Sequence, residues 1–91
     1  MYVIDVEKPV IVNIPANIIE YPDYGFTTAV VKWTAPSATD NSGSSTLTSS
    51  HSPDSSFNFG VTDVTYKAID LSENFVTEMF SVTVIGNLFV R

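Results

Sequence analysis

The amino-acid sequence predicts an all-β sandwich of about seven short strands. Apolar and polar residues alternate with a period of two in several segments, which places one side of each segment on a core. These segments are rich in β-branched and aromatic residues, as strands usually are. The five prolines and four glycines fall between the segments, where they mark turns.

The first part of the chain contains two short predicted strands. Pro9 opens the first, residues 9–14, and Pro15 ends it because proline cannot donate to a strand ladder. A second short run follows over residues 18–21. The sequence YPDYG at residues 21–25 then has the composition of a turn.

The middle of the chain alternates between strands and polar turns. Alternation of apolar and polar residues predicts a strand over residues 27–34. Residues 35–45 are expected to form a loop, with the strongest turn signal, DNSG, at residues 40–43. A short polar strand is predicted over residues 46–50, and the sequence HSPD at residues 51–54 predicts the next turn.

The last part of the chain contains the most regular alternation. Strands are predicted over residues 55–59, 62–69 and 75–85. Gly60 separates the first two, and residues 70–74 form the turn before the last. Because each strand buries one face, the inward positions define the expected core. These positions are Ile11, Ile18, Ala29, Val31, Trp33, Phe57, Val64, Tyr66, Ala68, Phe80, Val82 and Val84.

Two aromatic residues are expected to contribute the largest buried areas of this core. Full burial of Trp33 or Tyr66 contributes roughly 2–3 kcal/mol or more. Tyr66 also lies where sandwiches place a tyrosine whose hydroxyl bonds to the backbone at a corner.

Composition excludes several classes of function. The chain has 4 basic and 10 acidic residues and a net charge of −6, so it lacks the basic surface that nucleic acid requires. No apolar stretch approaches the ~18 residues of a membrane span, so no membrane insertion is expected. The start shows no signal-peptide pattern, although a piece of a longer protein would not need one. With no cysteine, disulfides and thiolate metal sites are excluded.

Two stretches of sequence resemble the hyalin-repeat (HYR) family. Residues 29–43, AVVKWTAPSATDNSG, match its pattern A-x-V-x-W-x-x-P-x-A-x-D-N-S-G. The second half of the pattern is matched by Phe57, Gly60, Val64, Tyr66, Ala68, Asp70 and Asn74, and its closing strand by Phe80, Val82 and Val84. The opening of the pattern matches the two proline-containing segments near residues 9–11 and 15–18.

The resemblance implies a particular fold and a broad function. It implies an immunoglobulin-like β-sandwich of about seven antiparallel strands over residues 5–85, with residues 86–91 as a tail or linker. It also implies a non-catalytic, extracellular or cell-surface module for cell adhesion or matrix assembly, with no obligatory cofactor. Its expected partners are an extracellular protein or neighbouring domains of the same chain, and self-association is a further possibility. The alternatives are a passive structural spacer and a carbohydrate-binding module.

The chain departs from the family pattern at an expected disulfide. The family usually has cysteines at the positions of Ile14 and Glu78, so both halves of the bridge are replaced together. Loss of such a bridge removes roughly 2–5 kcal/mol of stabilisation. Alternation points Glu78 toward the core, where an unpaired carboxylate is costly. We therefore expect Glu78 at an open end, reached by solvent or paired with Lys8 or Lys32.

A second departure lies in the turn at residues 70–74. The family has glycine where this chain has Glu73. Because only glycine adopts a positive φ at little cost, the substitution predicts a turn that does not need a positive φ there.

Four residues form a candidate calcium site. Asp40, Asn41, Asp70 and Asn74 lie in two predicted turns, and calcium prefers several oxygen ligands of this kind. The alternative is that these side chains bond to nearby backbone amides and hold their turns. The sequence lacks a D-x-D-x-D-G loop, so two separate loops would have to meet.

A candidate partner-binding site surrounds the first turn. Tyr21, Asp23 and Tyr24 combine aromatic and acidic groups, which are able to contact a basic partner. Tyr21, Tyr24 and Phe26 would form the aromatic platform of the carbohydrate-binding alternative. Near the middle of the chain, His51 has serine and aspartate neighbours in one polar loop. That arrangement predicts a solvated turn and not a catalytic triad, because a triad needs separate rigid elements.

Overall fold

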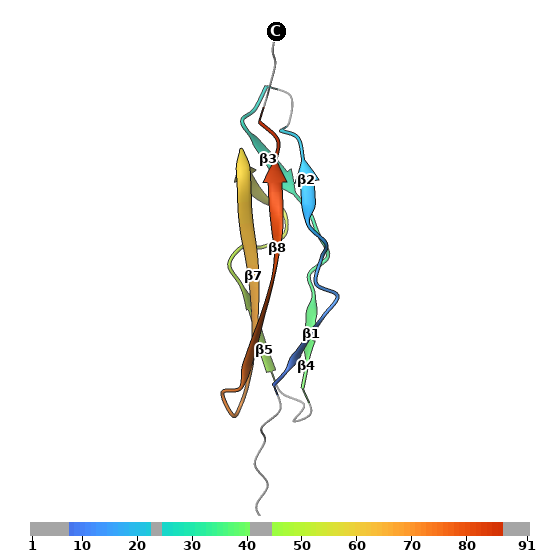
Figure 1. The fold of residues 1–91 in the computed structure, drawn as a ribbon, viewed down its shortest axis with the longest axis vertical. Coiled ribbons are helices and arrows are strands. Elements are labelled where there is room, and N and C mark those ends of the chain that lie inside the picture. The colour runs from blue at the N-terminus through green and yellow to red at the C-terminus, as the bar shows by residue number, and fades with distance from the viewer. Residues whose placement is uncertain (1–7, 23–24, 41–44, 87–91) are drawn as a thin grey trace, which may run out of the picture.

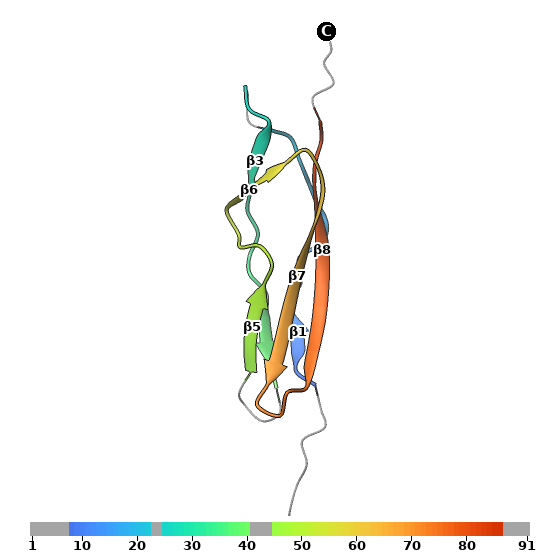
Figure 2. The same ribbon diagram turned by 90° about the vertical axis from the view of Figure 1, so that its left-hand side faces the viewer.

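The computed structural model describes residues 8–22, 25–40 and 45–86, which form eight strands and no helix. The strands are β1 (Val10–Val12), β2 (Ile18–Glu20), β3 (Thr28–Val31), β4 (Ser37–Thr39), β5 (Ser45–Ser49), β6 (Ser55–Asn58), β7 (Gly60–Asp70) and β8 (Phe75–Val84). One layer is a four-stranded sheet in the order β2-β8-β7-β5. The pairs β1-β4 and β3-β6 form the other layer and contact the sheet at different levels (Figures 1 and 2). The predicted all-β sandwich is therefore confirmed.

The long hairpin of β7 and β8 is the centre of the molecule. The two strands pair antiparallel from Gly60↔Val84 to Ile69↔Phe75. Gly60, which was expected to interrupt the strands, is the first residue of β7 and has a φ of 107°. A β-carbon in this conformation is strained, so glycine permits the sharp change of direction between β6 and β7.

The edge strand β2 corrects the prediction of a wholly antiparallel sandwich. β2 pairs with β8 in parallel, from Ile18↔Val82 to Glu20↔Val84. The chain crosses between layers after β1, where Asn13 has a φ of 64° and Pro15 cannot donate to a ladder. The side chain of Asn17 then accepts a 2.9 Å hydrogen bond from the backbone N–H of Ser81, which fixes this crossing segment to β8.

The strand β4 was not predicted from the sequence. It lies inside the expected loop of residues 35–45 and pairs antiparallel with β1, from Val10↔Thr39 to Val12↔Ser37. Its residues Ser, Ala and Thr lack an apolar alternation, so no periodic signal marks it. The strand exists because β1 offers it backbone partners.

The core confirms most of the inward positions. Nine residues of the expected set are buried: Ala29, Val31, Phe57, Val64, Tyr66, Ala68, Phe80, Val82 and Val84. Ile11, Ile18 and Trp33 are only partly buried and pack against this cluster, as do Ile14 and Leu47. Trp33 therefore contributes less buried area than a fully enclosed indole would.

Trp33 and Tyr66 form a polar contact at the edge of the core. The indole Nε1 of Trp33 donates a 2.8 Å hydrogen bond to the hydroxyl of Tyr66. The partner that the structure gives to this hydroxyl is thus an indole and not the corner backbone that we expected. The Trp33 ring also lies 5.2 Å from Phe80 and 6.0 Å from Phe57, centroid to centroid. These ring contacts, tilted with Phe57 and edge-on with Phe80, hold the indole against both layers.

Candidate functional site

The turn between β7 and β8 is organised by Asp70. The Oδ1 atom of Asp70 accepts hydrogen bonds of 2.9 Å from the backbone N–H groups of Ser72 and Asn74. Its Oδ2 atom accepts a 3.2 Å bond from the side-chain amide of Asn74. Asp70 is 5% exposed, so these bonds replace water around a buried carboxylate. These contacts are the ones expected under the alternative to calcium binding, in which the side chain of Asp70 bonds to nearby backbone amides and holds its turn.

The calcium candidates gather at one end of the sandwich. β4 ends just before Asp40, and the first residue of β5, Ser45, pairs with Asp70. This brings Asp40, Asp70 and Asn74 to the end that carries the β7–β8 turn, while Asn41 lies outside the described residues. Within the described ranges, no three acidic or histidine side chains are grouped closely enough to hold a metal ion. Calcium binding here stays a prediction.

Glu73 corrects the expectation that this turn avoids a positive φ. Its φ is 68°, in the left-handed region. Its N–H donates a 3.1 Å hydrogen bond to the carbonyl of Asp70, and the N–H of Asp70 donates a 3.0 Å bond to the carbonyl of Asn74. The turn therefore keeps the conformation that suits glycine, and the glutamate adopts it at a cost of about 1–2 kcal/mol.

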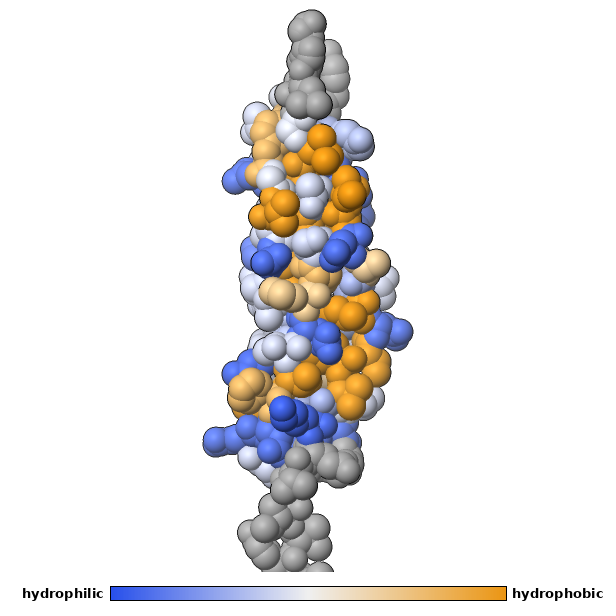
Figure 3. Space-filling view, in the orientation of Figure 1, coloured by the Kyte–Doolittle hydropathy of each residue, from blue (hydrophilic) through white to orange (hydrophobic). Residues whose placement is uncertain are grey.

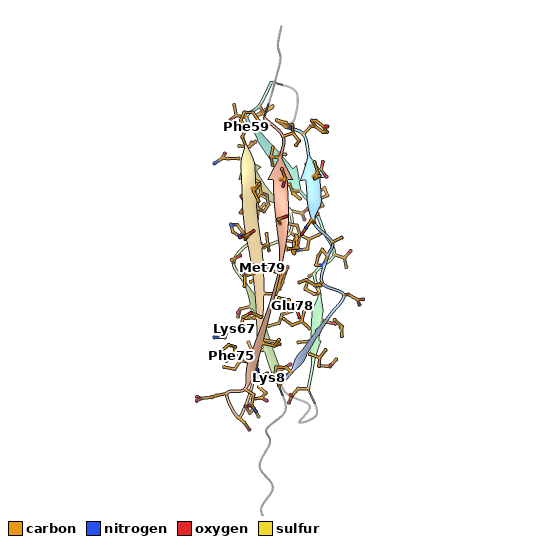
Figure 4. The ribbon with its side chains drawn as sticks, in the orientation of Figure 1. Lys8, Phe59, Lys67, Phe75, Glu78 and Met79 are labelled. Atoms are coloured by element: carbon orange, nitrogen blue, oxygen red, sulfur yellow. The ribbon has the colours of Figure 1, made fainter. Side chains whose placement is uncertain are left out.

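The opposite end of the sandwich carries exposed aromatic residues. Tyr21 follows β2 and is 70% exposed. Phe26 precedes β3, and Phe59 lies between β6 and β7; they are 66% and 41% exposed. Since Thr28 pairs with Asn58, the segments that carry Phe26 and Phe59 leave the paired strands at the same end (Figure 4 labels Phe59). We call Tyr21, Phe26 and Phe59 the aromatic end.

Only part of the predicted partner site falls within the described residues. Asp23 and Tyr24 lie outside them, so Tyr21 is the member of that set whose position is known. Backbone contacts hold it in place: the N–H of Ile85 donates a 2.9 Å bond to the carbonyl of Glu20, directly before Tyr21. Phe59 was not singled out from the sequence. The feature of the sequence that could have indicated its exposure is its position next to Gly60, where the chain turns from β6 into β7.

The polar loop of His51 is held by ordinary structural contacts. Its Nδ1 lies 2.8 Å from the Oγ of Ser50, and its ring lies 5.4 Å from that of Phe57. The ring is therefore half-buried and not fully solvated as expected. Asp54 does not serve the histidine, because its Oδ1 lies 3.0 Å from the Nζ of Lys32.

Glu78 occupies an open edge of the four-stranded sheet. It is exposed, which confirms that solvent reaches it, and the suggested pairing with Lys32 is wrong because Lys32 pairs with Asp54. In the part of the chain that the structure describes, Glu78 forms no ion pair, so pairing with Lys8 is not found either. β2 covers β8 only at Val82–Val84, so the edge beside Glu78 is left open to water (Figure 4).

The described part of the chain contains no helix of the length and hydrophobicity that a membrane crossing requires. Its strands form a small β-sandwich that exposes apolar side chains at both ends.

Comparison with known proteins then places the chain more narrowly. The HYR domain model matches residues 4–84, and the chain belongs to the HYR domain family. Hyalin from Strongylocentrotus purpuratus is 48% identical over 67 residues, which are 72% of this chain and 6% of that protein. The chain thus corresponds to a small part of the length of this relative. No solved structure was found to match it.

Proposed function

We propose that the chain is a non-catalytic module of an extracellular or cell-surface protein, and that it contributes to adhesion or matrix assembly by binding proteins. The main support is its membership of the HYR family across residues 4–84. The similarity to hyalin, a much longer protein, supports a role as one module among others.

The aromatic end offers this function a binding surface. Tyr21, Phe26 and Phe59 expose large amphipathic rings at the end where β8 finishes. Aromatic residues are enriched in the buried centres of protein interfaces, because they contribute much contact area for little lost side-chain entropy. A partner protein or a following module would bury these rings.

The test compares adhesion of beads that carry the chain with adhesion of bare beads, on surfaces coated with extracellular matrix. Wild-type beads should adhere, and the variant Tyr21→Ser/Phe26→Ser/Phe59→Ser should reduce adhesion several-fold. The matched control is Leu71→Ser, which removes an 82%-exposed apolar side chain at the opposite end and should leave adhesion unchanged. Wild-type beads that adhere no better than bare beads would contradict the proposal.

The second candidate, a structural spacer, is supported by the shape of the sandwich. The first described residue, Lys8, and the end of β8 lie at opposite ends of an elongated body (Figures 1 and 4). Two modules joined in series would then separate their neighbours along one line. Small-angle scattering of a tandem pair should show nearly twice the maximum dimension of one copy, and a value close to that of one copy would argue against a spacer.

A further inference from the structure

The outer face of the β7–β8 ladder has a centre flanked by opposite charges. The residues of β7 that alternate with buried ones face outward, away from the second layer. In the middle of this face Thr65 lies opposite Met79, which is 56% exposed. Along β7, the acidic Asp63 lies on one side of Thr65 and the basic Lys67 lies equally far on the other side. Both charged side chains are exposed.

Apolar residues continue the pattern beyond each charge. On the side of Asp63, Val61 pairs with Thr83, which pairs with Ile19 of β2; Val61 and Ile19 are 69% and 65% exposed. On the side of Lys67, Ile69 pairs with Phe75, which is 50% exposed. Figure 3 shows hydrophobic residues near the upper end of this side of the molecule and again in its lower half. The order along the face is apolar, acid, centre, base, apolar.

We propose that two copies of the chain dock through this face, related by a twofold axis that lies between the two faces and runs along the Thr65–Met79 row. A twofold axis lying across the strands reverses the face end to end, so each residue meets its counterpart on the other side of the centre. Asp63 of each copy then meets Lys67 of the other, and each apolar end meets an apolar end. The pattern is therefore complementary to itself. This inference rests on the proposed adhesive function and adds a partner to it, a second copy of the chain.

The two charges are available for such a contact. Four residues along a strand separate Asp63 from Lys67 by about 13 Å, too far for an ion pair within one copy. The Nζ of Lys67 lies 4.6 Å from the centre of the Phe75 ring, so the cation lies over the apolar end of the face (Figure 4). A short rotation of its side chain would bring it to a carboxylate of a facing sheet.

The size of the face predicts a weak contact. From Val61 to Ile69 the face is about 27 Å long, and it is only two to three strands, about 10–15 Å, wide, because β2 and β5 border the ladder at opposite ends. Two copies would bury roughly 500–800 Å² in total, which is below the range of standard specific interfaces. Two sheets with the same twist pack face to face at about −30°, about 10 Å apart. Such a pair is weak alone and effective when many copies are displayed together.

The test is sedimentation equilibrium of the 91-residue chain from micromolar to millimolar concentration. Wild type should dimerise weakly. Asp63→Lys and Lys67→Asp should each weaken self-association at least tenfold, because each variant places like charges opposite each other. An equimolar mixture of the two variants should form heterodimers at least as strongly as wild type, since all four facing charges are then opposite.

Two controls separate the effect from charge and from folding. Asp54→Lys makes the same substitution in the loop before β6, in the other layer, and should not weaken dimerisation. Met79→Lys places two cations at the axis and should abolish it, which provides a second test if either charge variant misfolds. A wild type that stays monomeric at millimolar concentration, single variants that associate normally, or a mixture that fails to associate would each overturn the inference.

The bead assay distinguishes this inference from the proposed function. Beads that adhere to matrix, together with a chain that shows no charge-dependent dimerisation, would overturn the docking face and leave the adhesive module standing. Charge-dependent dimerisation without adhesion to matrix would do the reverse.

Discussion

The two faces of the β7–β8 ladder consist of alternating residues of the same strands, yet they differ sharply in composition. The inner face contributes Val64, Tyr66, Phe80 and Val82 to the core, each at most 4% exposed. The outer face mixes threonine and serine with exposed apolar residues, one acid and one base. The comparison teaches that neighbouring residues can have separate roles, since inner positions determine stability and outer positions are free to determine contacts.

The largest expected effect comes from one pair of neighbours on β8. Phe80→Ala should destabilise the fold by about 3–5 kcal/mol, because it leaves a cavity beneath the Trp33 ring. Met79→Ala, on the outer face, should change the free energy of unfolding by less than about 0.5 kcal/mol. Urea unfolding of both variants tests the comparison. Similar losses for the two would show that the outer face also supports the core.

A disulfide between positions 14 and 78, where the family usually has cysteines, tests the exposed part of the inner face of β8. Ile14 packs against the core, and Glu78 lies in the inward phase of β8. The free energy of unfolding of the oxidised variant Ile14→Cys/Glu78→Cys should be about 2–4 kcal/mol higher than that of its reduced form. Failure of the thiols to oxidise would show that the two positions are too far apart for a disulfide.

Asp70 tests whether the inner face ends in a structural turn or in a metal site. Asp70→Ala should cost about 2–3 kcal/mol, because two backbone N–H groups lose a charged acceptor. Thermal unfolding with calcium and with EDTA separates the two functions of this residue. A rise in the unfolding temperature of wild type with calcium, absent in the variant, would establish the predicted site. Equal temperatures in both solutions would leave only the turn.

The smallest expected effect is a gain of stability at the same turn. Glu73→Gly should stabilise the fold by about 0.5–1 kcal/mol, because glycine adopts the observed φ of 68° without a steric penalty. Glu20→Gly, at a strand position, is the control and should destabilise. A loss of stability in Glu73→Gly would mean that the glutamate side chain contributes more than its backbone strain costs.

Much of this architecture could be predicted because the alternation of apolar and polar residues in the sequence corresponds to the two faces of each strand. The expected core residues of β7 and β8 are buried, because alternation with a period of two assigns each residue to one of two faces. The candidate site was harder to predict. Tyr21 and Phe26 were visible as exposed aromatics beside a turn, whereas Phe59 joins them only because β6 turns into β7 at the same end.

The sequence by itself determined the sandwich, most residues of its core and its membership of the HYR family, because periodicity and motif spacing are local properties of the chain. Tertiary structure alone decided the parallel pairing of β2, the existence of β4, and the positive φ of Glu73. The first two depend on which backbone groups a distant segment offers, whereas the φ of Glu73 belongs to the tight turn that joins β7 to β8. It also decided that Asp63 and Lys67 flank a centre shared with Met79, because register across two strands places those side chains on one face.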